Sequence, residues 1–263
     1  MTPVPETHAS TTIAPVRQVS VGRPLHWLAL GWRDFTRAPL ASALHGVLVM
    51  LGGLAILAIT LRFWQLLPGA FSGFVLVGPI LATGLYELSR RLERNQPVSL
   101  ADVMAAWRRG TRPLVWMGLV LMLAATLWVM FSAVLVAVSV QGPITGLDSL
   151  LRKVILDDES WLFPEWLLLG GIGAALVFAA TVVSLPLLLE RDVDLPGAVL
   201  TSVRAVGENP YAMALWAVII MVATALSVAT VMLGFIVAYP VIGHATWHCY
   251  RDLVNADRLP LRD

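Results

Sequence analysis

The sequence has little charge and almost no cysteine. Only 13% of its 263 residues are charged and 58% are hydrophobic, whereas an ordinary soluble domain is about 25% charged. This composition excludes an ordinary soluble globular protein, and it also excludes an intrinsically disordered chain, which would be poor in apolar residues. The single cysteine, Cys249, excludes an internal disulfide and a cysteine-based metal cluster. A net charge of +1 gives no sign of a nucleic-acid partner.

Charged residues are absent from five long stretches, 38–61, 63–86, 113–147, 166–189 and 209–250. A helix needs about 20 apolar residues to cross a bilayer. The last stretch is long enough for two crossings, with a break near Met232–Gly234. We therefore predict an all-α fold, a polytopic membrane helix bundle over residues 21–255 whose partner is the lipid bilayer. Its six transmembrane helices are predicted at about residues 40–61, 64–86, 113–138, 163–187, 211–231 and 234–250.

Arginine and lysine predict the orientation. With six transmembrane helices, 15 of the 18 basic residues fall on one side, and only Arg62, Arg152 and Lys153 fall on the other. Basic residues favour the cytoplasmic side, so both termini are predicted to be cytoplasmic; five helices would give a weaker division of 12 to 6. Residues 1–20 are rich in Pro, Thr and Ser and lack the apolar core of a signal peptide. We expect them to form a flexible cytoplasmic tail, and residues 256–263 form a second cytoplasmic tail.

Three cytoplasmic stretches share a pattern. Each has an amphipathic run, an arginine and, five or six residues later, a proline that precedes a predicted transmembrane helix: Pro39, Pro113 and Pro210. In the first run Leu25, Leu28, Trp32 and Phe35 share one helical face. Short helices of this kind are typical of the membrane interface, and proline ends them.

The second transmembrane helix of each pair also contains a proline, namely Pro79, Pro186 or Pro240. We interpret the pattern as three pseudo-repeats, each made of an interfacial helix and a helical hairpin. The alternative is that arginine and proline flank the membrane helices of this chain as they flank most others.

Few ionisable residues fall within or beside the predicted membrane helices, where burying charge is costly and usually functional. Glu87 and Glu190 end the second and fourth helices, and His244 and His248 lie four residues apart in the last. Aligned on the repeat prolines, these four residues occupy two equivalent positions, so they could gather near the cytoplasmic side. One hypothesis is a divalent metal or haem site, since imidazole and carboxylate suit zinc or iron.

The alternative for these four residues is pairing with arginines in the headgroup layer. The arginines nearest in sequence are Arg90, Arg91, Arg191 and Arg251. A further histidine, His45, lies early in the first predicted helix and is expected to form a hydrogen bond that helps the helices pack.

The sequence contains no nucleophile–base pair, no phosphate-binding glycine loop and no basic–aromatic pattern for nucleic acid. We therefore predict no catalytic residues and do not favour an enzyme. The first functional hypothesis is an accessory, assembly or scaffold subunit, whose protein partners would be other membrane subunits. A small permease or lipid-handling protein with a cavity between the proline-containing helices is an alternative. A metal- or haem-binding protein that uses His244 and His248 is another.

Three stretches of the sequence resemble a known family. They are GWRDFTRAP (31–39), GPILATGLYELSRRLE (78–93) and PVIGHATWHCYRDLV (240–254). They resemble the domain-of-unknown-function family 2189, a bacterial family of predicted integral membrane proteins, and the resemblance extends over about residues 20–255. It implies a multi-pass protein of the bacterial inner membrane that has no established activity.

Overall fold

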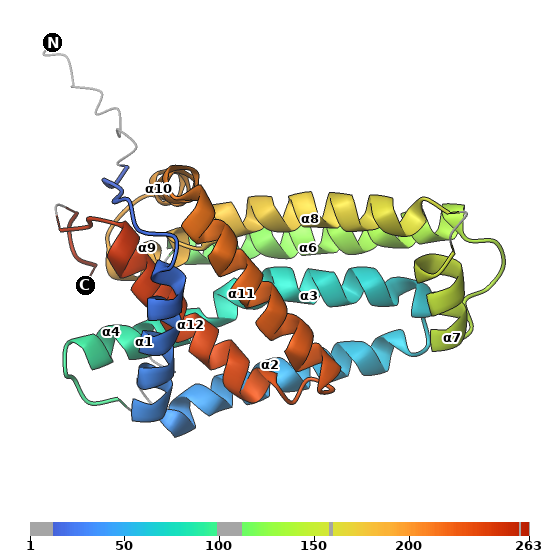
Figure 1. The fold of residues 1–263 in the computed structure, drawn as a ribbon, viewed down its shortest axis with the longest axis horizontal. Coiled ribbons are helices and arrows are strands. Elements are labelled where there is room, and N and C mark those ends of the chain that lie inside the picture. Colours follow the sequence, from blue (N-terminus) through green and yellow to red (C-terminus); the bar gives the residue numbers. More distant parts are fainter. Residues whose placement is uncertain (1–12, 99–111, 158–159, 258, 263) are drawn as a thin grey trace, which may run out of the picture.

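The structure is a computed structural model that describes residues 13–98, 112–157, 160–257 and 259–262 (Figure 1). Within these residues the chain is helical, as predicted, and its only extended pairings are two isolated bridges. The helices are α1 (Arg23–Arg37), α2 (Pro39–Thr60), η1 (Trp64–Leu66), α3 (Leu67–Leu81), α4 (Thr83–Glu93), α6 (Arg112–Ser139), α7 (Leu147–Leu150), the π-helix η2 (Leu151–Ile155), α8 (Leu162–Thr181), α9 (Ser184–Glu190), α10 (Leu195–Glu208), α11 (Pro210–Ala229) and α12 (Phe235–Leu253).

Five segments of the described chain are long and apolar enough to cross a membrane. They are Pro39–Thr60, Ser72–Glu93, Arg112–Ser139, Leu162–Glu190 and Pro210–Ala229. The prediction of several apolar membrane helices is thereby confirmed. Helix α12 is not among the five, so the number of six crossings stays a prediction.

Prolines start two of these helices, where the sequence analysis placed them. Pro39 begins α2 and Pro210 begins α11. The residues before them have nearly the same backbone angles, φ −135° and ψ 57° at Ala38 and φ −129° and ψ 48° at Asn209. A residue before proline is kept out of the α region, so the chain changes direction at both places. Helix α1 therefore runs across the direction of α2 and the other long helices (Figure 1).

The middle amphipathic run of the proposed repeat lies outside the described residues. Its proline, Pro113, is the second residue of α6. Only the first and third runs can be compared with helices of the structure, and these are α1 and α10.

The long helices pack against one another through small residues. A methyl group at Gly69 of α3 would lie 2.8 Å from Ser132 Cβ of α6, and one at Gly73 would lie 3.0 Å from Val129 Cγ2. The first contact is shorter than real Cβ atoms show and the second is tighter than most of them, so glycine permits this separation of α3 and α6. On the faces of the long helices that point away from the protein, large apolar side chains are exposed, among them Leu123 of α6, Leu168 of α8 and Met221 of α11. Such faces suit contact with lipid.

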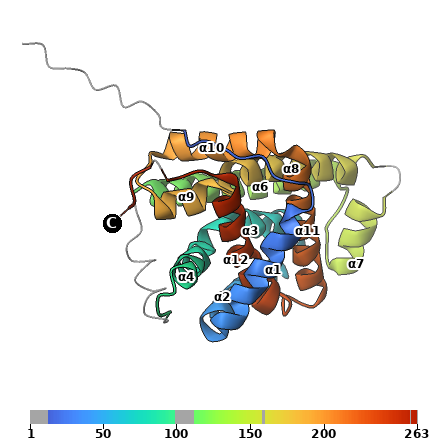
Figure 2. The same cartoon turned by 60° about the vertical axis from the view of Figure 1, so that its left-hand side comes forward.

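Segments from both ends of the chain lie together. The Arg17 N–H donates to Leu253 O at 2.7 Å and the Asn255 N–H to Pro15 O at 2.9 Å. The side chain of Asn209 binds the same N-terminal segment, accepting from the Val19 N–H at 2.8 Å. Figure 2 shows this segment running along α10. In the C-terminal tail Pro260 O accepts from the Asp192 N–H at 3.0 Å, so the described parts of both predicted tails contact the rest of the protein.

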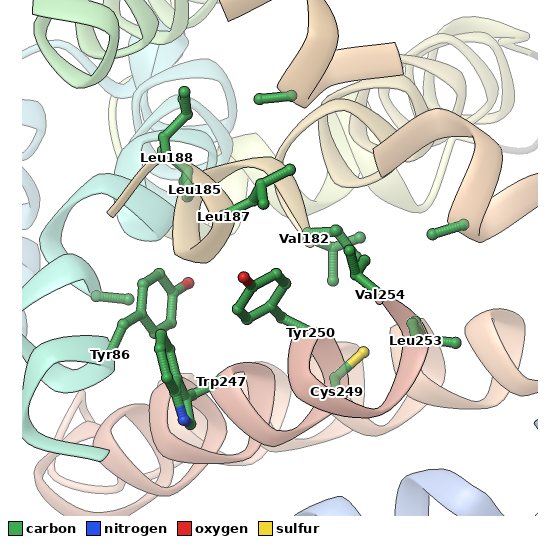
Figure 3. Packing of buried hydrophobic residues seen from close by; sticks show 14 of the residues in the cluster. Tyr86, Val182, Leu185, Leu187, Leu188, Trp247, Cys249, Tyr250, Leu253 and Val254 are labelled. Atoms are coloured by element: carbon green, nitrogen blue, oxygen red, sulfur yellow. The ribbon is translucent and has the colours of Figure 1, made fainter. Parts of the chain in front are cut away.

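A buried core joins α4, α9 and α12 at the end of the molecule where the two termini lie. Leu185, Leu187 and Leu188 of α9 belong to this core together with Tyr86 of α4 and Tyr250 of α12, and all five side chains are at most 2% exposed (Figure 3). This packing fixes the C-terminal half of α12 between its neighbours. We call the region formed by α1, α4, α9 and residues 243–253 of α12 the polar end, because the buried ionisable side chains described below gather there.

Candidate functional site

Helix α12 is the element around which the candidate site is built. It packs against α1, α2 and α4, and glycines permit close contact with each. A methyl group at Gly31 of α1 would lie 2.5 Å from Val241 O, and one at Gly46 of α2 would lie 2.5 Å from Phe235 O. A methyl group at Gly243 of α12 would lie 2.5 Å from Leu85 Cδ1 of α4. At Gly31 and Gly46 a larger residue would meet backbone atoms and would separate the helices.

Five buried polar residues from four helices form one hydrogen-bonded network, which we call the Asp34 cluster. Its members are Asp34 of α1, Ser42 of α2, Ser89 of α4, and His244 and His248 of α12, and none is more than 9% exposed. Ser89 Oγ donates to Asp34 Oδ2 at 2.9 Å, and His248 Nε2 lies 2.8 Å from the same oxygen. His244 Nδ1 lies 2.7 Å from Ser89 Oγ, and its Nε2 lies 2.9 Å from Ser42 Oγ.

Proton positions follow from the charge on Asp34. Burial alone would raise the pKa of this carboxyl, but hydrogen bonds from His248 and Ser89 and the charge of His248 outweigh burial and hold the pKa below its usual value. Because Ser89 donates to the carboxylate, its oxygen accepts from His244 Nδ1–H. Ser42 Oγ lies within 2.7 Å of Ala38 O as well as beside His244 Nε2. When Ser42 donates to the imidazole, every polar atom of the neutral ring has a partner.

A second contact ties α1 to α12 near the chain ends. Asp252 accepts from the Arg23 guanidinium and, at 2.8 Å, from Trp27 Nε1. Burial opposes ionisation of Asp252, but the hydrogen bonds from Arg23 and Trp27 lower its pKa below the usual value. One turn of α1 thus binds α12 through Asp252, and a later turn binds it through Asp34.

The two glutamates singled out from the sequence pair with arginines. Glu87 accepts from Arg90 Nε at 2.7 Å and from Arg91 Nε at 2.9 Å. Glu190 is 3% exposed and accepts from the Tyr250 hydroxyl at 2.6 Å. Arg94, Arg191 and Arg251 each reach it at 3.4 to 3.5 Å.

These contacts are the arginine pairing that the sequence analysis gave as the alternative to a metal site. The four proposed ligands are not brought into one group: His244 and His248 belong to the Asp34 cluster, whereas Glu87 and Glu190 have separate partners. No set of three or more His, Cys, Asp or Glu side chains in the described residues has the arrangement of a metal site. The metal- or haem-binding hypothesis stays a prediction that rests on the sequence spacing. His45 Nδ1 lies 2.8 Å from Ala41 O, within its own helix.

Three members of the cluster, Asp34, Ser42 and Ser89, were not singled out from the sequence. A signal for Asp34 exists in α1, whose buried residues Pro24, Trp27, Gly31 and Asp34 are spaced as one helical face. The opposite face of α1, which carries the large apolar side chains of the amphipathic pattern, points outward, and Leu25 is 60% and Trp32 52% exposed. The partners of Asp34 are 55 and 214 residues away in sequence, so local spacing could not identify them.

An apolar groove of about 840 Å³ lies between α1, α11 and α12. Leu28 and Trp32 of α1, Val222 of α11 and Val237 of α12 are among the residues that line it. None of Pro79, Pro186 and Pro240 lines this groove, so it is not the cavity that the permease hypothesis places between the proline-containing helices.

The arrangement of the Asp34 cluster favours a structural task over chemistry. A carboxylate, two imidazoles and two hydroxyls are present, but all are buried among helices and each has a partner within the cluster. Removing one partner would leave the others buried and unsatisfied, which is costly. The cluster therefore fixes α1, α2, α4 and α12 in one arrangement.

The three stretches that carry the family resemblance meet at this cluster. Asp34 comes from the first stretch, Ser89 from the second, and His244 and His248 from the third. No curated protein and no solved structure matches the chain. Residues 66–190 match the family described as predicted integral membrane protein (DUF2189), which confirms the predicted resemblance over this part of the chain.

Proposed function

We propose that the chain is an accessory, assembly or scaffold subunit of a complex in the bacterial inner membrane, without catalytic activity of its own. The observation that carries the proposal is the pairing of the buried ionisable groups at the polar end with one another. Asp34 and Glu190 have hydrogen-bonding partners on other helices, which they hold together, and Glu87 pairs with arginines of its own helix. Ionisable groups that are buried and already paired stabilise the fold and are not free to bind or to react with a substrate.

The proposed topology has six membrane-embedded helices as three hairpins, with both termini cytoplasmic. The excess of arginine on one side supports the orientation. The hydrogen bonds between residues 15–17 and 253–255 support two termini on the same side, because the bilayer would separate them after an odd number of crossings. The matching backbone angles at Ala38 and Asn209 support the pseudo-repeat.

The surface that would bind a partner subunit is the outward apolar face of the long helices. Leu123 of α6, Leu168 of α8 and Met221 of α11 are each 60 to 64% exposed. In a membrane these positions contact either lipid or another transmembrane helix. The proposal predicts that at least one of them contacts protein.

Photo-crosslinking in living cells tests the proposal. A photoreactive amino acid placed at Leu123, Leu168 or Met221 should form a discrete crosslinked band with another membrane protein at one of the three positions. Asp148 of the α7 turn, whose side chain is 79% exposed, is the matched control and should form no such band. When the chain is extracted in lipid nanodiscs, the crosslinked partner protein should copurify with it in a nearly equal molar amount. Crosslinks to lipid alone at all three positions, with a monodisperse monomer after extraction, would contradict the proposal.

A lipid-handling role is the second candidate, and the groove between α1, α11 and α12 favours it. Its volume lies in the range of small-molecule sites, and its lining is apolar. Ala223→Phe would fill the groove, whereas Ala175→Phe places the same ring on the exposed face of α8. A lipid that copurifies with the wild type and with Ala175→Phe, but not with Ala223→Phe, would support this role.

A further inference from the structure

The turn between α11 and α12, residues 230–234, lies beside the middle of α2, whereas the other two hairpin turns lie at the far end beside α7 (Figure 1). A methyl group at Gly53 of α2 would lie 3.0 Å from Met232 Sδ in this turn. Gly53 is 14 residues after Pro39 and 7 residues before Thr60. At 1.5 Å per residue the turn therefore stops about 10 Å short of the end of α2.

Helix α12 returns to the polar end within a short distance. Phe235, its first residue, lies against Gly46 of α2, and Val241 and Ala245 lie against Gly31 of α1. Only 11 residues, 235–245, separate the start of α12 from its contact with α1, which lies across the ends of the long helices. A crossing needs about 20 residues, and a segment of 10–14 is typical of re-entrant or interfacial helices.

The turn itself is apolar on its outside. Val231 is 64% and Leu233 is 60% exposed, and the whole stretch 209–250 lacks charged residues. The turn on the far side between α2 and α3 contains Arg62 and Gln65, and the α7 region contains Asp148, Arg152 and Lys153. Valine and leucine insert favourably into hydrocarbon, so the exposed side chains of this charge-free turn suit a position within the bilayer.

The backbone N–H groups of the turn have hydrogen-bonding partners within the chain. The N–H groups of Val231, Met232 and Leu233 donate to Val228 O, Ser227 O and Thr230 O, and the Gly234 N–H donates to Thr230 Oγ1. Val231 and Met232 have left-handed backbone, with φ of 51° and 70°. Such angles are unusual for a β-branched residue, but they let the turn satisfy its own donors. An unpaired backbone N–H group in hydrocarbon is costly, and these bonds within the chain remove that cost for the donors of the turn.

We propose that α11 and α12 form a re-entrant hairpin. The hairpin enters the membrane from the side of the polar end, its turn contacts lipid acyl chains within the bilayer, and α12 returns to the side from which α11 entered. The chain then crosses the membrane four times, through α2, α3–α4, α6 and α8–α9. This inference goes beyond the proposed function and requires only that the chain is membrane-embedded.

Thiol labelling of single-cysteine variants tests the hairpin. In a Cys249→Ala background, cysteine is introduced at Val231 in the turn, at Asp148 near α7 and at Val21 before α1, the last two being exposed positions on opposite ends of the molecule. A membrane-impermeant maleimide is applied to right-side-out and to inverted membrane vesicles. Asp148→Cys and Val21→Cys should each label in one vesicle type only, and in opposite types.

Val231→Cys should label in neither vesicle type and should label fully after the membrane is dissolved in sodium dodecyl sulfate. Labelling of Val231→Cys in the same vesicles as Asp148→Cys would overturn the proposal in favour of six crossings, and labelling in the same vesicles as Val21→Cys would overturn it by placing the turn in water on the polar-end side. The Asp148 and Val21 variants report the orientation of the chain separately, so an error there would not be mistaken for failure of the hairpin.

A nitroxide attached at residue 231 gives a second measurement. It should collide with dissolved oxygen more often than with a water-soluble nickel chelate, because oxygen concentrates in hydrocarbon. A nitroxide at residue 148 should show the opposite preference. Equal preference for the nickel chelate at both positions would overturn the proposal.

Discussion

The polar end and the middle of the long helices are held together by different interactions. At the polar end, α1, α4 and α9 pack on α12 through buried carboxylates, imidazoles and arginines that satisfy one another. In the middle, α3 and α6 pack through Gly69 and Gly73, without charged groups. Small-residue packing allows many related arrangements of apolar helices, whereas a buried polar network is satisfied in few. We infer that the polar end determines which arrangement the helices adopt.

The largest effect is expected from removing the central carboxylate of the Asp34 cluster. Asp34→Ala leaves Ser89 and His248 buried without their acceptor, which should lower the free energy of unfolding by about 3–5 kcal/mol. Asp148→Ala removes a carboxylate that is 79% exposed and should change it by less than about 0.5 kcal/mol. Unfolding by sodium dodecyl sulfate in mixed micelles, followed by circular dichroism, measures both. An equal loss of unfolding free energy in the two variants would mean that the buried carboxylate of the polar end contributes no more to stability than an exposed one.

A smaller effect is expected where α1 packs on α12. Gly31→Ala places a methyl group 2.5 Å from Val241 O, so the helices must separate, at a cost of about 1–3 kcal/mol. Gly171→Ala, in α8, meets no atom within 4 Å and should be neutral or slightly stabilising, because alanine favours helix. The thermal midpoint in detergent compares the two variants. A Gly31→Ala protein as stable as Gly171→Ala would show that the close crossing is not needed.

A loss of about 1 kcal/mol is expected from Ser42→Ala, which removes the hydroxyl beside His244 Nε2. Thr126→Val is the control, since the Thr126 hydroxyl bonds only to Met122 O of its own helix on an exposed face. The same detergent unfolding measures both variants. If both lose equal stability, the hydroxyl of Ser42 acts within its own helix and not through His244.

The smallest effect is a change with pH. The pKa of Asp34 and that of Asp252 are lower in the folded protein than the unfolded value of about 3.9. Their contribution to stability is therefore present above about pH 4 and is lost as the pH falls below that value toward the folded pKa. The midpoint of detergent unfolding should decrease from pH 5 to pH 3 in the wild type, and decrease less in Asp34→Ala. An unchanged slope in the variant would exclude Asp34 as a source of this dependence.

The sequence predicted the helical architecture and many helix boundaries for physical reasons that act locally. Charge-free stretches located the apolar helices, and Pro39 and Pro210 located two junctions because proline restricts the residue before it. Glu87, Glu190, His244 and His248 were recognised because ionisable residues are rare in such stretches. Asp34 was overlooked because it sits in a helix with several other charges, and only the fold shows that it faces Ser89 and His248.

The faces of the amphipathic helices were the least predictable feature. In α1 the bulky side chains Leu25 and Trp32 face outward, and the stripe containing Gly31 and Asp34 faces the protein. In α10 the buried residues are likewise small, such as Ala198, Ser202 and Ala205. In a membrane protein lipid can cover large apolar side chains, so hydrophobicity does not tell the protein-facing side from the lipid-facing side.

The most direct test of the claim that the polar end is a structural tie is a double-mutant cycle on Asp34 and His248. Unfolding free energies are measured in mixed micelles for Asp34→Ala, His248→Ala and the double variant. The account predicts that the double variant is more stable than the sum of the single losses implies, with a coupling of about 0.5–3 kcal/mol, because each single change strands the other partner. Single losses that add to within about 0.3 kcal/mol would contradict the account.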